Sequence, residues 1–447
     1  MIKTFIQVFF GSMIVSTILY VDCKQGDRLS KFKKDLTNNA IYDVKPLQTL
    51  HGIKWKYKTH GYVFSSPVVF ENKLFEGSND SCFYAIDARN GQLIWKYKTG
   101  GIISSTPAVS DGGVYFESFD GNLYALDIHT GRQKWYFYGG PEKQFTTYGI
   151  HGIQPKNQLM ADPWDMYLSS PTVVNNKVLF GSGNGKFYAV DVHTGKEVWS
   201  FATNDVIHSS PAVSGNKVFF GGWDTYLHAL DIETGREIWR FETGKDTIVH
   251  NQTGIQASPV VYNGIVYFGC RDAHLYAIDE ETGKLRWKKF NNYSWVICTP
   301  VIKDSILYYG TSDTHKLWAL KASTGDSVFN TNLRAFIFSS PIIAQNAIYV
   351  GDFSGSMYAV DTHTGKIYWT FRTQASIDNK LAVLNKTGNI PDEFFNRYFE
   401  NGKSYTYDNN IQMMKDLYSI GSILTTPTIE NGTVYVGSAD GTIYALE

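Results

Sequence analysis

The chain repeats one unit eight times. A pair of small residues followed by proline marks the start of each unit. The eight copies are Ser65-Ser66-Pro67, Ser105-Thr106-Pro107, Ser169-Ser170-Pro171, Ser209-Ser210-Pro211, Ala257-Ser258-Pro259, Cys298-Thr299-Pro300, Ser339-Ser340-Pro341 and Thr425-Thr426-Pro427. A Tyr-Ala-Leu-Asp segment or a close variant ends twenty residues after each proline, except in the sixth copy, which is one residue longer. Such a period is the signature of a repeat architecture, so we expect one large domain.

Each unit is expected to form four short strands. The residues after the proline are apolar and β-branched, as in Pro67-Val68-Val69-Phe70, and polar or Gly-containing turns separate the later apolar runs. Strands that are apolar on both faces must lie between neighbouring sheets. A four-stranded unit of about forty residues, repeated eight times, predicts an all-β fold: an eight-bladed β-propeller of four-stranded antiparallel blades.

Two residues recur at fixed places and are interpreted as structural. An Asp precedes the Thr-Gly turn, where its carboxylate can accept turn N–H groups, and a Trp eight residues later is expected to pack one blade on the next. The Asp residues are Asp87, Asp127, Asp191, Asp231, Asp279 and Asp361. The Trp residues are Trp55, Trp95, Trp135, Trp199, Trp239, Trp287 and Trp369.

The two ends of the repeat region are expected to pair. The last unit has three strands and stops at Glu447, whereas Ile53-Lys54-Trp55-Lys56-Tyr57 matches the fourth-strand pattern seen around Trp95. The N-terminal strand would then complete the last blade and leave no open sheet edge. Residues 50–447 are therefore assigned to a single propeller.

Every substantial insertion falls in the same connection between blades. The interval from the repeated aromatic residue to the next proline is 12 residues in four units, but it is 20 before Pro259, 36 before Pro171 and 58 before Pro427. These connections share one face of a propeller, so that face is expected to bind. The insertions span about 138–166 and 374–420, and the second contains two segments with helical spacing, 390–395 and 410–417. We expect a pair of helices that packs over this face.

The N-terminus has the order of an export signal. Lys3 precedes an apolar run that ends at Val21, and a polar stretch follows. Residues 1–22 are interpreted as a signal peptide and 23–49 as a linker, with a membrane anchor as the competing interpretation. Cys23 falls where a bacterial lipoprotein carries its lipidated cysteine, which makes it the lipidation candidate. The protein is thus expected to be exported.

Composition excludes several classes. The 447 residues carry a net charge of −1, which gives no electrostatic reason to bind nucleic acid. Cys82, Cys270 and Cys298 stand at long spacings, without a CxxC metal or haem motif. They are interpreted as buried thiols, or as one disulfide and one thiol, and no metal ligand is assigned.

The repeat resembles a known family. The Ala-x-Asp-x-x-Thr-Gly-x-x-x-Trp pattern, clear at Ala125 to Trp135, Ala189 to Trp199 and Ala229 to Trp239, is similar to the PQQ-type propeller repeat. That repeat occurs in quinoprotein dehydrogenases and in outer-membrane assembly lipoproteins of the BamB type. The resemblance covers about 50–447. Because this family contains both enzymes and scaffolds, its motif is specific for the fold and much less specific for activity.

The resemblance implies two functions of different classes. The first is a non-catalytic exported propeller that serves as a scaffold and binds protein partners in the periplasm or at the outer membrane. It would be monomeric and attached to the membrane only through Cys23. The second is a dehydrogenase that uses PQQ and Ca²⁺ to oxidise an alcohol or sugar, which would need oxygen ligands for the metal, an Asp base and an aromatic floor. A ligand-binding sensor domain is a third option. The first is preferred, without a cofactor, because the adjacent cysteines common in the dehydrogenases do not occur here.

Seven residues are candidates for a binding rim at the mouth of the channel. Five stand just before the proline of a repeat, and two lie on the insertion around 138–166. They are His208, His250, Asn251, Trp295 and Arg334, with Trp164 and Asp165.

Overall fold

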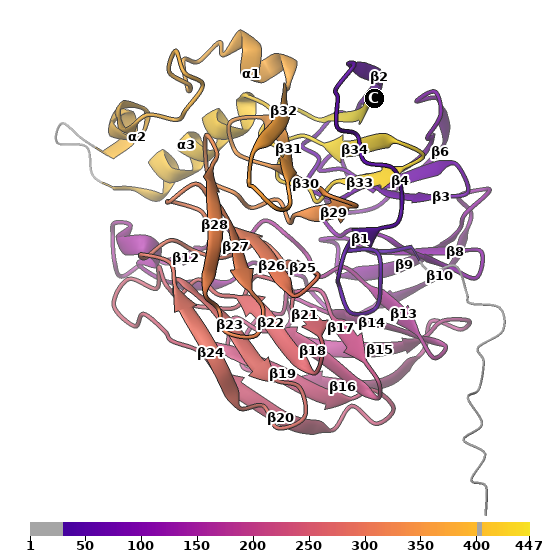
Figure 1. Cartoon of the computed structure of the whole chain (residues 1–447). Coiled ribbons are helices and arrows are strands. Elements are labelled where there is room, and N and C mark those ends of the chain that lie inside the picture. The colour runs from indigo at the N-terminus through magenta and orange to yellow at the C-terminus, as the bar shows by residue number, and fades with distance from the viewer. Residues whose placement is uncertain (1–29, 400–404) are drawn as a thin grey trace, which may run out of the picture.

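The eight repeats fold into eight four-stranded antiparallel sheets arranged as blades around a central channel (Figure 1). The computed structural model describes residues 30–399 and 405–447. In every blade a three-residue inner strand follows the proline, and a six-residue strand forms the outer edge. The predicted eight-bladed propeller is confirmed.

The blades follow the order of the chain. Blades 1 to 4 contain, from the channel outward, β3 Val68–Phe70, β4 Lys73–Gly77, β5 Cys82–Asp87 and β6 Leu93–Lys98; β7 Ala108–Ser110, β8 Gly113–Glu117, β9 Asn122–Asp127 and β10 Gln133–Tyr138; β13 Thr172–Val174, β14 Lys177–Gly181, β15 Lys186–Asp191 and β16 Glu197–Ala202; β17 Ala212–Ser214, β18 Lys217–Gly221, β19 Tyr226–Asp231 and β20 Glu237–Glu242. Blades 5 to 7 contain β21 Val260–Tyr262, β22 Ile265–Gly269, β23 His274–Asp279 and β24 Leu285–Phe290; β25 Val301–Lys303, β26 Ile306–Gly310, β27 Lys316–Lys321 and β28 Ser327–Asn332; β29 Ile342–Ala344, β30 Ala347–Gly351, β31 Ser356–Asp361 and β32 Ile367–Arg372. Blade 8 contains β33 Thr428–Glu430, β34 Thr433–Gly437, β35 Thr442–Leu446 and β2 Ile53–Lys58.

The N-terminal strand closes the ring, as the sequence predicts. β2 pairs antiparallel with β35, and Trp55 lies opposite Ala445. Blade 8 is thus built from both ends of the repeat region.

The small-small-Pro motif joins neighbouring blades around the channel. The backbone N–H of the second small residue donates to the hydroxyl of its counterpart in the next blade, which requires a short hydroxyl side chain at that place. The pairs that make this bond are Ser66 to Thr106, Thr106 to Ser170, Ser170 to Ser210, Ser210 to Ser258, Thr299 to Ser340 and Thr426 to Ser66. The last of these bonds connects blade 8 back to blade 1.

The repeated Trp and Asp residues lie on the two outer strands of the blades, away from the channel. Six of the seven Trp residues donate their Nε1–H to a backbone carbonyl of the following blade, as Trp199 does to Ile232 at 3.2 Å, whereas Trp369 donates to Leu47 of the N-terminal segment. The other such pairs are Trp55 to Ala88, Trp95 to Ile128, Trp135 to Val192, Trp239 to Glu280 and Trp287 to Ala322. The Asp side chain accepts bonds within its turn, from Thr in five units and from Arg89 at Asp87.

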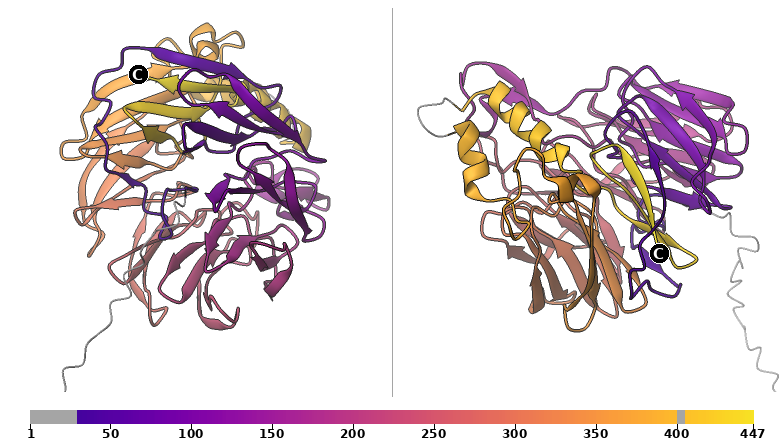
Figure 2. Two further views of the ribbon diagram at one scale, coloured as in Figure 1. Left: turned by 90° about the vertical axis from the view of Figure 1, so that its right-hand side faces the viewer. Right: turned by 90° about the horizontal axis from the view of Figure 1, so that it is seen from above.

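Residues 30–43, here called the strap, cross the channel on the face opposite the insertions (Figure 2, left). Ser30 pairs with Val109, the carbonyl of Leu36 accepts from Val213 N–H, and β1 Ile41–Tyr42 pairs parallel with β29. The inner strands turn an unpaired edge toward the channel, and the strap supplies partners for their backbone groups. The described part of 23–49 is therefore packed into the ring, and the expectation of a linker was wrong for it. Residues 1–22 and Cys23 lie outside the described residues.

Both long insertions lie on one face, here called the decorated face (Figures 1 and 2). The first forms the hairpin β11 Thr146–Tyr148 and β12 Leu159–Ala161 around a short 3-10 helix, η1 Ile150–Gly152. The second forms α1 Gln374–Asp378, α2 Asp392–Phe399 and α3 Tyr407–Ser419. The two predicted helices correspond to α2 and α3, while α1 was not anticipated.

One buried hydrophobic cluster, with residues from both insertions and the ring, packs the helical insertion against the ring. Phe394 of α2 and Met413, Met414 and Leu417 of α3 are buried together with Trp164 of the first insertion. Within the described residues, no helix combines the length and the apolar character needed to cross a bilayer.

Candidate functional site

The central channel is narrow. Its cavity measures about 50 Å³, which is room for a few water molecules. The second small residue of every repeat lines it: Ser66, Thr106, Ser170, Ser210, Ser258, Thr299, Ser340 and Thr426. Phe32 of the strap bounds the cavity on one side, and Phe64, Tyr167, Phe338 and Leu424 bound it toward the decorated face. The channel interior is therefore filled by side chains of the protein itself.

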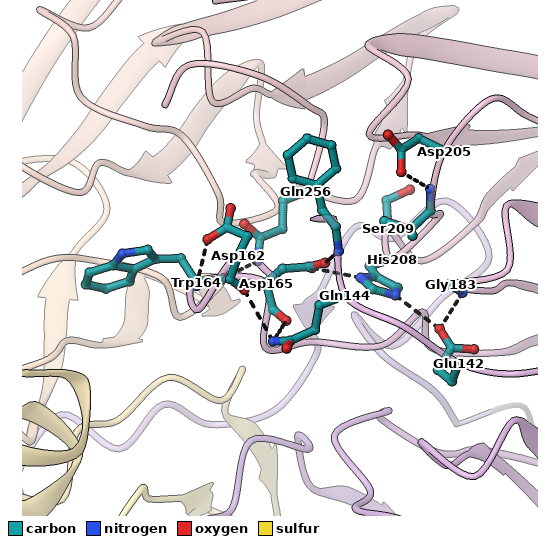
Figure 3. Close-up of polar contacts among 12 residues, drawn as sticks. Glu142, Gln144, Asp162, Trp164, Asp165, Gly183, Asp205, His208, Ser209 and Gln256 are labelled. Carbon is teal, nitrogen blue, oxygen red and sulfur yellow. Dashed lines mark hydrogen bonds and ion pairs between the residues drawn. The ribbon is translucent and has the colours of Figure 1, made fainter. Parts of the chain in front are cut away.

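A buried ion-pair cluster fastens the first insertion to blades 3 and 4 (Figure 3). His208, just before the proline of blade 4, places Nδ1 2.7 Å from Asp165 Oδ1 and Nε2 3.1 Å from Glu142 Oε1. Glu142 also accepts from the hydroxyl of Ser182 and from Gly183 N–H. All three titratable side chains are almost fully removed from water.

The charge state of this cluster follows from its geometry. Burial disfavours the charged imidazolium of His208, but Asp165 and Glu142 outweigh burial and raise the pKa of His208 to about 10. Both ring nitrogens then carry protons and donate, one to each carboxylate. Burial also raises the pKa of the nearby Glu117, and Glu142 raises it further. His208 is thus protonated at neutral pH and is held between the side chains of Asp165 and Glu142.

A second buried cluster stands beside the first. Asp162 forms an ion pair with Arg271 and lies 2.9 Å from His151 Nε2. The Arg271 guanidinium is sandwiched between Trp223 at 4.4 Å and Trp295 at 4.2 Å from the ring centroids. Burial opposes the charge on Asp162, but Arg271 and His151 together hold its pKa below the usual range.

These clusters support an aromatic pocket on the decorated face. The pocket measures about 390 Å³ and lies between blades 5 to 7 and the helices α2 and α3. Its apolar walls are Trp164, Tyr293, Trp295, Phe336, Phe338, Phe395, Phe399, Tyr405 and Met413. Its polar lining is His151, Asn251, Gln252, Asn292, Ser312 and Asp313. The first insertion contributes Trp164 and His151, and both are held in place from behind.

The structure gathers some of the seven rim candidates and separates others. Trp164, Trp295 and Asn251 line the aromatic pocket, whereas Asp165 and His208 form the ion pair beside it. The remaining two lie elsewhere. Arg334 donates its backbone N–H to Asp352, and His250 stands in a turn with a left-handed backbone at φ 55°.

Sequence reasoning missed four residues of this site. Glu142, His151 and Asp162 lie on the first insertion and Arg271 at the end of blade 5's second strand. The one signal in the sequence was that the insertion carries several charges in a chain region without repeat constraints. Which of them meet a partner 109 residues away is decided by the ring.

The channel cavity is small, and among the described residues the lining of the aromatic pocket includes no Lys or Arg and one carboxylate, Asp313. Residues 30–399 and 405–447 contain no group of three or more His, Cys, Asp or Glu side chains placed to hold a metal ion.

Comparisons with known proteins agree with this architecture. The sequence profile described as outer membrane protein assembly factor BamB matches residues 16–155, 157–294 and 272–389. A search of curated proteins finds no significant match. Among solved structures, BamB from Moraxella catarrhalis is 18% identical with a TM-score of 0.62, covering 89% of this chain and 100% of that one.

Enzymes of the same architecture are equally similar. A europium-containing methanol dehydrogenase is 13% identical with a TM-score of 0.66, covering 93% of this chain and 98% of that one. The quinohemoprotein alcohol dehydrogenase from Comamonas testosteroni is 14% identical with a TM-score of 0.66, covering 93% and 80%. At these identities the likeness shows the fold alone.

Proposed function

The chain belongs to the family of the outer membrane protein assembly factor BamB, and from this premise we propose that it is a non-catalytic propeller that binds protein partners in the cell envelope. The observation that carries the proposal is the difference in size between the channel cavity, about 50 Å³, and the aromatic pocket on the decorated face, about 390 Å³. A ring whose centre is filled by its own side chains offers its loops, not its interior, to a ligand.

Location and assembly state form part of the same proposal. The protein is exported to the periplasm, acts as a monomeric ring, and is attached to the outer membrane through a lipid on Cys23. The family supports an envelope location. The strap begins at Ser30 on the face opposite the decorated face, so an anchor at Cys23 would leave the decorated face free.

Titration with a cofactor tests the enzyme alternative. The purified protein is titrated with PQQ and Ca²⁺ while its Trp fluorescence is followed, and a dye-linked alcohol oxidation assay is run on the same sample. We expect neither stoichiometric quenching nor turnover. Stoichiometric binding together with dye reduction would replace the scaffold by a quinoprotein dehydrogenase, and stoichiometric binding without turnover would favour a sensor domain.

Site-specific crosslinking tests the binding face in the producing cells. A photoreactive residue is placed at Tyr293 on the decorated face, and a matched one at Asp304 in the inner-strand turn of blade 6 on the opposite face. We expect adducts with envelope proteins from position 293 and far fewer from position 304. Equal yields at both positions, or none at either, would contradict the proposal.

A further inference from the structure

The lining, charge and rim of the aromatic pocket indicate which class of ligand it can bind. We infer that it receives a bulky, uncharged apolar side chain of an extended protein segment, with a basic residue next to that side chain in the segment. This inference rests on the proposed function and specifies which chemistry the partner presents. It concerns the pocket over blades 5 to 7, under α2 and α3.

The floor of the pocket favours a neutral ligand over a cationic one. Arg271 stacks on the inner face of Trp295 at 4.2 Å, so the positive charge already draws on the π-electrons that a second cation would need. A neutral ring or aliphatic side chain loses nothing by contact with the outer face of Trp295. Trp164 stands nearly perpendicular to Trp295 at 6.1 Å, so two walls of the pocket meet at a right angle.

The charges of the lining exclude an acidic ligand. Asp313 is the one carboxylate on the pocket wall, and the described lining contains no lysine or arginine to bind an anion. Asp313 is exposed at the rim, where a basic residue beside the inserted side chain could pair with it in water. The charge pattern therefore fits an apolar residue next to Lys or Arg.

The rim points to a protein segment, which is longer than a small molecule. Tyr293 is 69% exposed, and Ile248, in the same loop as Gln252, is 82% exposed, so apolar contact continues outside the pocket mouth. The side-chain amides of Asn251, Gln252 and Asn292 line the mouth and can bond to a peptide backbone. Asn292 and Tyr293 hold left-handed backbones at φ 53° and 61° and form a tight turn beside the pocket.

The pocket is held in shape before any ligand arrives. His151 on its wall is fixed between Asn251 and Asp162, and Asp162 is fixed by Arg271. Support of this kind lowers the ordering cost of binding.

Labelled peptides provide the test. Binding to the purified protein is measured by fluorescence anisotropy for a nonapeptide whose central Phe-Lys pair is flanked by uncharged Ser and Asn residues. Matched peptides carry Ala-Lys or Phe-Glu in place of the central pair. We expect the Phe-Lys peptide to bind about tenfold or more tightly than the Ala-Lys peptide, and the Phe-Glu peptide to bind more weakly than Phe-Lys.

Paired variants locate the binding. Tyr293→Asn, which keeps a residue suited to the left-handed backbone, and Phe395→Ala should each weaken the Phe-Lys peptide about tenfold. The controls are Tyr138→Asn on the outer strand β10, where the side chain is 58% exposed, and Ile377→Ala on α1, where it is 56% exposed. Thermal unfolding of each variant is recorded, and both controls should bind like the wild type.

Several results would overturn the inference while leaving the proposed function standing. These are equal binding of the three peptides, wild-type binding by both pocket variants, or saturation by N-acetyl-phenylalaninamide with the affinity of the full peptide, which would indicate a small-molecule site. If position 293 still gives envelope crosslinks in any of these cases, only the pocket's ligand class fails. Loss of the crosslinks as well would remove the proposed function itself.

Discussion

At the scale of single residues, the molecule contains buried groups that the repeat does not require. Glu76 stands where the other blades carry an aromatic or aliphatic residue, is fully buried, and neither carboxylate oxygen has a hydrogen-bond partner among the described residues. It lies against Gly437 at the joint between blades 8 and 1. Such a group costs free energy whenever it is ionised.

Glu76→Gln should change how stability depends on pH. Burial raises the pKa of Glu76 above its ordinary value of 4.5. Below pH 4.5 the carboxyl is protonated in both the folded and the unfolded chain, and as pH rises toward the folded-state pKa the native protein loses stability. The variant, measured by urea unfolding, should be more stable than the wild type by about 1–3 kcal/mol at pH 8, with the difference vanishing near pH 4. If the unfolding free energies of the variant and the wild type changed in parallel with pH, the result would contradict an unpartnered carboxyl at Glu76.

His208 should stabilise the native protein, whereas Glu76 destabilises it, and the stabilisation by His208 should be lost at high pH. Its folded-state pKa of about 10 exceeds the ordinary 6.5, so its stabilisation is complete below pH 6.5 and is lost as pH rises through 10. His208→Asn removes the cation that Asp165 and Glu142 share and should cost about 3–5 kcal/mol at pH 6. The difference in unfolding free energy between the variant and the wild type should narrow by pH 10, as measured by urea unfolding. His129→Asn, in an exposed turn, is the control and should change nothing.

Two glycines of blade 4 separate backbone strain from blade packing. Gly215 and Gly235 both have positive φ, at 56° and 69°, but a Cβ at Gly215 meets no atom within 4 Å, whereas one at Gly235 would lie 2.5 Å from Trp199. Gly215→Ala should cost about 1–2 kcal/mol for backbone strain alone. Gly235→Ala should cost a further ~1–3 kcal/mol because Trp199 must move. Equal losses in thermal unfolding would show that the Trp contact is not tight.

At the scale of elements, two N-terminal segments play different parts. β2 completes blade 8, and the strap bonds to inner strands around the channel. The sequence predicted β2, because its pattern copies the outer strand of the other units. It did not reveal the strap, because Lys31, Lys33 and Asn38 look like residues of a solvated linker. Their burial depends on backbone carbonyls that come together only in the closed ring, as when Lys33 donates to Pro341.

Truncation should distinguish these segments. A chain beginning at residue 44 keeps Leu47, whose carbonyl accepts from Trp369, and keeps β2, so it should remain folded with a melting temperature lower by roughly 5 °C or more. A chain beginning at residue 59 exposes the edge of β35 and should aggregate on size-exclusion chromatography. A soluble, cooperatively melting monomer from residue 59 would contradict closure by β2.

At the scale of the whole molecule, repetition made the fold predictable and deviation made the site hard to predict. The period and the pairing of the chain ends followed from recurring residues such as Trp95 and Pro107. The site depends on pairs such as Asp162 with Arg271, which no local pattern marks. Trp295 was identified as a rim residue because it stands just before a repeat proline, and Trp164 because it lies on the first insertion. The proline criterion also selected Arg334, which lies apart.

The ring should be a monomer in solution because charged side chains on its outer strands oppose pairing between the sheet edges of two molecules. Outer strands carry lysines at exposed positions, such as Lys56 on β2 and Lys96 on β6. Charges there discourage pairing between the edges of two molecules. Sedimentation velocity should give one species near 50.4 kDa for the full chain. Lys56→Thr combined with Lys96→Thr should add larger species, while Lys186→Thr, on a third strand of blade 3, should not.

The strap also constrains when the native state can first exist. Its bonds run to Val109, Val213, Val261 and Ile343, and β2 waits for β35, so contacts of the first few dozen residues span nearly the whole sequence. At about 5–20 residues per second, a ribosome needs roughly 20 to 80 s to make the intervening chain. The bond to Val109 can form early, but the bonds to Val261 and Ile343 and the pairing of β2 with β35 must wait until those residues have been made. The chain is therefore most exposed to misassembly while blade 8 is unfinished and the edge of β35 has no partner strand.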